Sequence, residues 1–140
     1  MRLLIATPTE VVIDQADVRA VRAEDESGGF GILDGHDDLL TALTVSVVSW
    51  HGDDGRRRYC AVRRGVLSVT GGREVAVATR EAIVGEDLDR LEQDVLAQFR
   101  QRAETERAAR SESLELQMKA IRQIVRYLRP GQPGLGEPGA

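Results

Sequence analysis

The chain has 140 residues, of which 41% are hydrophobic, a net charge of −4 at pH 7 and a single cysteine. This length fits one domain, or a small domain with an appendage, and the hydrophobic fraction is sufficient for a modest core. The interspersed charges exclude the basic face of a nucleic-acid-binding protein, no apolar run approaches the roughly 20 residues of a membrane-spanning helix, and Cys60 cannot form an internal disulfide.

The first 85 residues contain short apolar runs separated by turn-forming residues. In several runs apolar and polar side chains alternate, as expected of strands with one face in the core and one in water. The opening run Met1–Ala6 is too short for a signal peptide. Strands at this spacing predict an antiparallel β-sandwich over residues 1–85. The expected strands cover residues 2–6, 11–13, 18–23, 42–50, 56–64, 65–70 and 74–79.

One stretch, residues 28–43, combines glycines, acidic side chains and one histidine between two apolar clusters. Glycine adopts positive φ angles at little cost, so we interpret this stretch as a tight, shaped turn between strands. In this interpretation Phe30, Ile32 and Leu33 point into the core, and Leu39, Leu40 and Leu43 continue it.

From residue 86 to residue 129 there is no glycine or proline, and the apolar residues follow a helical period. Two apolar stripes result, one formed by Leu88, Leu91, Val95 and Phe99, and one by Leu114, Met118, Ile121, Val125 and Leu128. The residues between them contain only alanine as an apolar type. Two structures fit this pattern: a hairpin that turns around residues 108–113, capped by Ser111 or Ser113, or one continuous helix.

Charge favours the hairpin. Residues 86–106 are acidic and residues 107–129 are basic, so the two halves attract when they lie antiparallel. Burial of the stripe residues, worth about 1.5–3 kcal/mol each, exceeds the roughly 0–1 kcal/mol of an exposed ion pair. We therefore predict an α+β chain: a sandwich over 1–85, a helical hairpin over 86–129 and, from its prolines and glycines, a disordered tail over 130–140.

No constellation indicates catalysis. Asp34, His36, Asp37 and Asp38 carry metal-ligand groups, but neighbours on one turn seldom converge on one ion, so we expect no metal and no cofactor. The Cys60 thiol lies in a predicted strand, where a core or edge position is the commoner role. The run Arg56–Arg58 fits either a phosphate or acidic partner, or a solvated sheet edge that opposes aggregation.

Several motifs resemble the epsilon subunit of F-type ATP synthases. Residues 31–43 are similar to its Gly-Ile/Leu-x-Pro-Gly-His-x-Pro-Leu-Leu-Thr-x-Leu signature, with Asp34 and Asp38 in place of the two prolines. Thr7-Pro8 resembles the family's opening strand and turn. The run Gly65–Val69, with Ala82-Ile83 and Asp87-Leu88-Asp89, resembles its closing stretch. The matches follow the family's order through about the first 90 residues.

The resemblance implies a non-catalytic central-stalk subunit that couples rotation of the gamma subunit and the c-ring to ATP synthesis or hydrolysis. It further implies contact with the alpha and beta subunits when the C-terminal helices extend and inhibit hydrolysis, and a peripheral position on the cytoplasmic face of the bacterial plasma membrane. Nucleic acid is not an expected partner. The residues assigned to the gamma or c-ring interface are Phe30, Gly31, Ile32, Leu33, Gly35 and His36.

Some members of that family bind ATP through an Ile/Leu-Asp-x-x-Arg-Ala motif. Here Glu92 and Gln93 occupy the arginine and alanine positions, and a carboxylate repels phosphate, so we predict no ATP binding at this motif. The arginine-rich second half of the helical region indicates a divergent class of these synthases, and proton and sodium both stay open as the coupling ion. Two alternatives are an interaction module of another assembly and a small enzyme that uses Asp34, His36 and Cys60.

Overall fold

The computed structural model describes residues 1–128 and contains ten strands followed by helix. Most of the expected strands are present, which confirms the β-rich N-terminal part. The strands are β1 (Arg2–Ala6), β2 (Val11–Gln15), β3 (Val18–Asp25), β4 (Gly28–Leu33), β5 (Leu39–Leu43), β6 (Ser46–Gly52), β7 (Arg57–Val62), β8 (Gly65–Thr70), β9 (Glu74–Thr79) and β10 (Ala82–Gly85).

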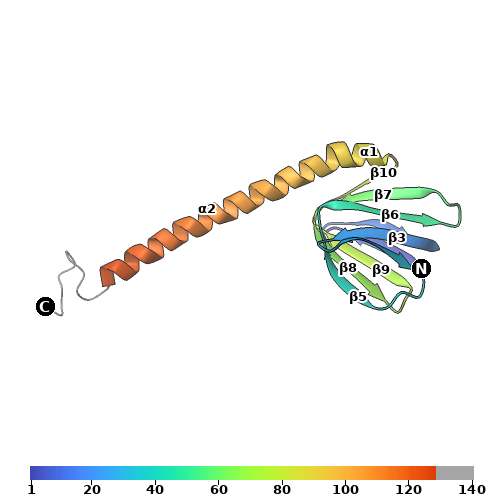
Figure 1. Ribbon diagram of the computed structural model, residues 1–140, viewed down its shortest axis with the longest axis horizontal. Helices are drawn as coiled ribbons and strands as arrows, with labels where there is room; N and C mark the ends of the chain where they lie inside the picture. Colours follow the sequence, from blue (N-terminus) through green and yellow to red (C-terminus); the bar gives the residue numbers. More distant parts are fainter. Residues whose placement is uncertain (129–140) are drawn as a thin grey trace. The chain divides into compact units, whose positions relative to one another are not determined.

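The strands form two layers of a sandwich (Figure 1). One layer has the order β10-β7-β6-β3 with β4 paired to β3, and the other has the order β5-β8-β9-β1-β2. Only the pair Asp25 and Leu43 joins β3 to β5, so the sheet is nearly divided there. All pairings are antiparallel except that of β1 with β9, which places the N-terminal strand inside the second layer.

The core fills the space between the layers with side chains from both. Trp50 is 1% exposed, and its indole Nε1 donates a hydrogen bond to Oε1 of Gln15 at 2.9 Å. This bond satisfies the one polar atom of the largest core residue. Around it pack fully buried aliphatic side chains, among them Leu3, Ile5, Val21, Ile32, Val48, Leu67 and Val77.

The glycine-rich stretch differs from its prediction as one long turn. Its first six residues form β4, which pairs with β3 around a turn at Glu26 and Ser27. Alternation along β4 buries Ile32 completely and half-buries Phe30, as expected, but leaves Leu33 64% exposed. The inward orientation predicted for Leu33 is therefore wrong, because neighbouring residues of a strand face opposite sides.

Gly65, at the start of β8, holds a position that only glycine can occupy. Its φ is +141°, and a Cβ there would lie 2.0 Å from the carbonyl oxygen of Ala78 on the paired strand β9. The preceding residue, Arg64, also has a positive φ of 61°. The tight connection from β7 into β8 therefore depends on the missing side chain of Gly65.

The helical region begins at Asp87, whose carboxylate Oδ1 accepts hydrogen bonds from the backbone N–H groups of Asp89 and Arg90 at 3.1 and 3.3 Å. The segments are α1 (Leu88–Arg90), a π-helical turn η1 (Leu91–Val95) and α2 (Leu96–Leu128). The N–H of Leu96 bonds to the carbonyl of Leu91, which is the i→i+5 pattern of a π-turn. That wider turn brings Leu91 and Leu96 onto the same face.

A second hydrophobic cluster joins this helix start to the sandwich. Leu91, Leu96 and Phe99 are 1–5% exposed and pack with buried Ala61 of β7. The stripe prediction for Leu91, Val95 and Phe99 is consistent with this packing, although Val95 is only partly buried and Leu96 was missed. The first compact unit accordingly runs from Met1 to Gln101, beyond the strand-to-helix change at Gly85.

The predicted hairpin is corrected to a continuous helix. Residues 108–113, where we expected the turn, are helical, and α2 is unbroken to Leu128. The physical reason is local: the segment has no glycine or proline and is rich in alanine, arginine, glutamate and glutamine, which favour helix over a turn. The second predicted stripe lies on α2 with its side chains exposed. The predicted tail, residues 130–140, lies outside the described residues.

Candidate functional site

Much of the outer face of the layer β5-β8-β9-β1-β2 is apolar and exposed, and its charged residues are Arg2, Glu74 and Asp14. Strand register places two rows of residues side by side across it: one contains Leu40, Ser68, Ala76 and Leu4, and the next contains Ala42, Val66, Ala78, Ala6 and Val11. We call these nine residues the outer apolar face. Leu40 is 73% exposed, Val11 60% and Val66 45%.

Such a face is unusual for a strand surface in water, where polar residues normally alternate with core residues. Apart from Arg2 and Glu74 at their first positions, the strands β5, β8, β9 and β1 are apolar or small on both sides, which is the pattern of a sheet covered on both faces. Near-continuous apolar runs in the sequence therefore already indicated a sheet that is covered on both faces. We assigned these runs only to the core. Contiguous apolar surface of this kind marks an interaction site.

The loop between β4 and β5, residues 34–38, is fastened to the turn between β8 and β9. The N–H of Gly35 donates to the carbonyl of Gly72 at 2.8 Å, and Oδ1 of Asp38 accepts from the N–H of Gly71 at 2.9 Å. Gly35 has a φ of +84°, and a Cβ on Gly72 would lie 2.8 Å from Cα of Gly35. The two turns are thus in close backbone contact, and glycine is needed on both sides.

His36 lies in this loop as a partly exposed side chain. Its N–H donates to the carbonyl of Leu33 at 3.1 Å, and its ring Nδ1 is 2.6 Å from the carbonyl oxygen of Asp37. Exposed Leu33 precedes the loop, and Leu40 follows it. In the sequence, His36 thus lies between two exposed leucines, one at the end of β4 and one in β5.

The six residues assigned to an interface by resemblance divide into two groups. Gly31, Leu33 and Gly35 are exposed and His36 is partly so, whereas Ile32 is 0% exposed in the core. Phe30 is partly buried and packs against the same core. The side chain of Ile32 lies between the two sheets, and the assignment of the six residues to an interface stays a prediction.

The residues of the enzyme alternative do not converge. Cys60 is fully buried in the core, and burial raises the pKa of its thiol to about 12, which opposes the thiolate form. His36 lies on a surface loop. Within residues 1–128, no group of three or more His, Cys, Asp and Glu side chains is placed to hold a metal ion.

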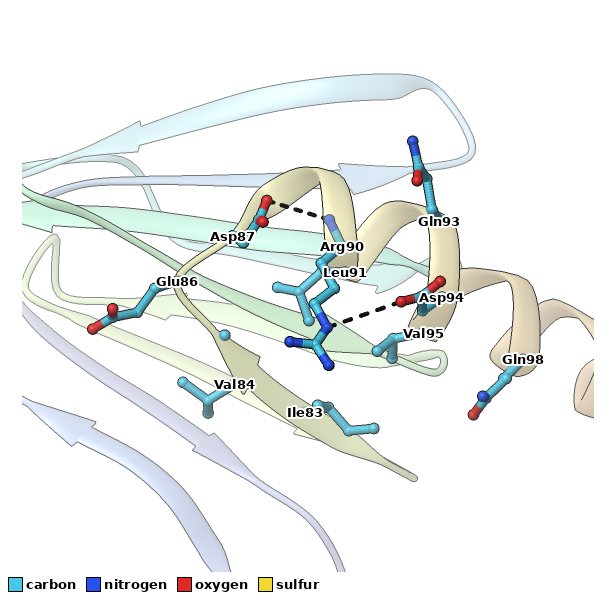
Figure 2. Close-up of a pocket in the computed structure, with 11 residues that line it drawn as sticks. Ile83, Val84, Glu86, Asp87, Arg90, Leu91, Gln93, Asp94, Val95 and Gln98 are labelled. Carbon is cyan, nitrogen blue, oxygen red and sulfur yellow. Dashed lines mark hydrogen bonds and ion pairs between the residues drawn. The ribbon is translucent and has the colours of Figure 1, made fainter.

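A groove of about 910 Å³ lies between β10 and the helix start (Figure 2). Its walls include exposed Ile83 and Val84 from β10. Three carboxylates, those of Glu86, Asp87 and Asp94, line it with one guanidinium, Arg90, whose Nε lies 3.9 Å from Oδ2 of Asp94. The charge balance of this groove is therefore negative.

The positions of the ATP-binding motif do not face a common space. Gln93 lines the groove in Figure 2, whereas Leu88 and Glu92 line a different groove on the sandwich. Arg90, which we considered as a weak substitute for the motif arginine, lies among carboxylates. The absence of ATP binding at this motif stays a prediction, and the negative groove is consistent with it.

No helix within residues 1–128 combines the length and the apolar character that crossing a bilayer requires.

Comparison with known proteins is consistent with this architecture. Residues 1–85 match the family described as ATP synthase, Delta/Epsilon chain, beta-sandwich domain. The chain is 43% identical over 132 residues to ATP synthase epsilon chain 2 of Paraburkholderia xenovorans, with 94% of this chain and 95% of that protein covered. It is 44% identical over 128 residues to ATP synthase epsilon chain 2 of Cereibacter sphaeroides, with coverage of 91% and 88%.

Two solved structures share the fold. A chain in the mitochondrial ATP synthase of Euglena gracilis, in an OSCP/F1/c-ring structure, superposes with a TM-score of 0.56 at 22% identity, covering 65% of this chain and 58% of that one. A chain in the central stalk and c-ring structure of the Tetrahymena thermophila mitochondrial ATP synthase gives a TM-score of 0.54 at 11% identity, covering 67% and 71%.

Proposed function

Because this chain belongs to the ATP synthase Delta/Epsilon chain family, we propose that it is a non-catalytic central-stalk subunit of an ion-translocating ATP synthase. The observation that carries this proposal is the match to two epsilon chains along more than 90% of the sequence, sandwich and helix together. The subunit transmits rotation between the c-ring and the catalytic head. It acts as a peripheral component of the complex, on the cytoplasmic face of the bacterial membrane.

The gamma subunit is the proposed occupant of the outer apolar face. The face is broad, has its charged neighbours Asp14, Arg2 and Glu74 beside it rather than among its nine residues, and consists mainly of small side chains, so it suits close packing against another protein. Burial of Leu40 and Val66 there supplies the apolar contact that these side chains lack in the isolated chain.

The loop of residues 34–38, with Leu33 and Leu40 beside it, is the proposed contact with the c-ring or with gamma. Its backbone is held by the bonds from Gly35 and Gly71, so the shape exists before a partner binds. A preformed loop loses little conformational freedom on association. Exposed Leu33 supplies the apolar contact, and His36 supplies a polar one.

Co-expression with the matching gamma subunit, followed by size-exclusion chromatography, tests the proposal. We expect co-elution of the full chain and loss of co-elution for Ala42→Arg or Ala78→Arg on the outer apolar face. Ala97→Arg is the matched control, since Ala97 is an exposed alanine on the helix, away from this face. Failure of the unmodified chain to co-elute would contradict the family role, and equal behaviour of all three variants would contradict the assigned face.

Regulation by the helix is a separate part of the proposal. A version that ends at Gln101 keeps the first compact unit and removes the second. We expect assembled enzyme with this version to hydrolyse ATP faster than enzyme with the full chain if α2 inhibits the head. Unchanged hydrolysis with normal co-elution would assign the subunit a coupling role without inhibition.

A further inference from the structure

A second groove, of about 560 Å³, lies between the outer surface of β3, β6 and β7 and the first turns of the helix. It is lined mainly by polar side chains, and it includes Arg57, the central residue of the arginine run that the sequence left open between an anion site and a solvated edge. β7 pairs with β6 along its whole length, whereas its pairing with β10 covers only Tyr59 to Val62 and ends before Arg57. Arg57 therefore lies where, among the described residues, β7 is paired on one side only, and a solvated edge and an anion site both stay open for it.

Strand register places donors side by side on the floor of the groove. Arg22 of β3 is directly opposite Ser49 of β6, and Ser49 is directly opposite Tyr59 of β7. Directly opposed residues have Cβ atoms roughly 4.5–5.5 Å apart. Arg57 precedes Tyr59 by two positions and so lies on the same face of β7. Arg100 of α2 lines the groove from the helix side.

The arginines of this groove lack the partners that their neighbours have. Arg56 pairs with Glu86 at 3.2 Å and Arg58 with Asp54 at 3.4 Å, but Arg57 between them forms no ion pair with any of the described residues. Arg22 and Arg100 likewise form no ion pair within residues 1–128. Three guanidinium groups thus line one groove without a carboxylate in contact.

Ser49 supplies an independent observation. Its side chain lines the groove although the residue is only 9% exposed, and its hydroxyl has no hydrogen-bond partner among residues 1–128. The Ser49 oxygen is not one of the fully buried polar atoms that lack a partner, so it opens toward the groove and can donate or accept a hydrogen bond there. Ser49 lies between Arg22 and Tyr59, so its hydroxyl is the middle one of three neighbouring hydrogen-bond donors.

We propose that this groove binds a phosphate group. The planar guanidinium donates paired N–H groups that match phosphate oxygens, and serine and tyrosine hydroxyls complete such sites. Two carboxylates, Glu24 and Glu92, line the same groove and reduce its affinity. The net charge of the lining is nevertheless positive. The phosphate comes either from a free small anion or from a lipid headgroup, and this assignment does not depend on the role proposed above.

Calorimetric titration of the full chain with inorganic phosphate at low ionic strength tests the proposal. We expect a dissociation constant in the millimolar range and weaker binding at high salt, because the arginines are exposed. Arg57→Gln should weaken binding about tenfold, as expected for loss of one charge-assisted hydrogen bond. Glu92→Gln should tighten binding, since it removes repulsion from the groove.

Arg56→Gln is the matched control, because Arg56 is adjacent in sequence and lies outside the groove. Vesicles of phosphatidylcholine, with and without phosphatidylglycerol, identify the source of the phosphate by co-sedimentation. Binding to phosphate alone assigns a soluble anion, and Arg57-dependent binding to the anionic vesicles assigns a lipid headgroup. Absence of both, or equal effects of Arg56→Gln and Arg57→Gln, would overturn the proposal.

Discussion

Asp38 and Gly71, 33 residues apart in the chain, are joined by a 2.9 Å hydrogen bond from the backbone N–H of Gly71 to the carboxylate of Asp38. Asp38 occupies a position where the resembling signature has proline. A proline restricts its own backbone, whereas the carboxylate reaches the turn between β8 and β9 and holds it. The Asp38 side chain thus helps to fix the loop that we assign to the c-ring or gamma interface.

Replacement of Asp38 by alanine should loosen the loop with little effect on the core. The Gly71 N–H can turn to water, so we expect a loss of about 0.5–1.5 kcal/mol in the free energy of unfolding. Urea unfolding measures this loss, and hydrogen exchange should show faster exchange at Gly71. Asp38→Asn is the control, because the amide oxygen can still accept the bond. Unchanged exchange in Asp38→Ala would show that the bond does not hold the turn.

Substitution of Gly65 by alanine should be far more damaging. The backbone at φ +141° is unfavourable for any side chain, and the added Cβ would lie 2.0 Å from a backbone oxygen that cannot move freely. We expect a loss of about 3 kcal/mol or more in the free energy of unfolding. Gly71→Ala is the control, since Gly71 also has a positive φ, of 62°, but open space around it. Its cost should be about 1 kcal/mol, and equal costs would refute the steric explanation.

Asp25, at the end of β3, should contribute stability that acid removes. Hydrogen bonds from the Ser27 hydroxyl, and then from the Thr41 hydroxyl, hold the pKa of the Asp25 carboxyl below its ordinary value. A group whose pKa is lower in the folded state stabilises the fold above its unfolded pKa, of about 3.9, and this stabilisation is lost as pH falls through the folded pKa. Below about pH 4 the protein should therefore weaken.

An NMR titration of the carboxyl groups checks this effect. Thr41→Val and Ser27→Ala should each raise the pKa of Asp25 toward its ordinary value. They should leave Asp14 unchanged, because the Arg2 guanidinium lowers the pKa of Asp14 instead. An unchanged Asp25 pKa in both variants would exclude the two hydroxyls as the cause.

The sandwich was predictable because its strands alternate, and Val18–Asp25 or Glu74–Thr79 could be located to within a few residues. The helix start at Asp87 was predictable from its acidic residues. Leu96 was missed because a π-turn shifts the helical register, and no simple residue pattern specifies that turn. The hairpin prediction was wrong because it rested on the opposite charges of the two halves of the helical region. Opposite charges attract, but they do not supply the residues that form a turn.

The outer apolar face was missed for a different reason. Small residues such as Ala42 and Ala78 are compatible with core and with interface, and only the register of β5, β8 and β9 shows that they share an exposed surface. The groove of Arg22 and Arg57 likewise combines residues from strands that are distant in sequence. Sites of this kind require the pairing of strands, which alternation alone does not determine.

A chain ending at Gln101 should be markedly more stable than one ending at Gly85. The shorter version loses Leu91, Leu96 and Phe99, whose burial contributes about 1.5–3 kcal/mol each, and exposes Ala61 of β7. Since whole domains are stable by only about 5–15 kcal/mol, this loss is a large fraction of the total.

Thermal unfolding of the two versions measures the difference. The Gln101 version should unfold near the midpoint of the full chain, and the Gly85 version at a clearly lower temperature with increased binding of a hydrophobic dye. The double variant Leu96→Ala, Phe99→Ala in the Gln101 version is the control, and it should approach the shorter version because it removes two of the three buried side chains without removing backbone. Equal midpoints for the two truncated versions would show that the helix start does not belong to the sandwich unit, and would return the domain boundary to Gly85.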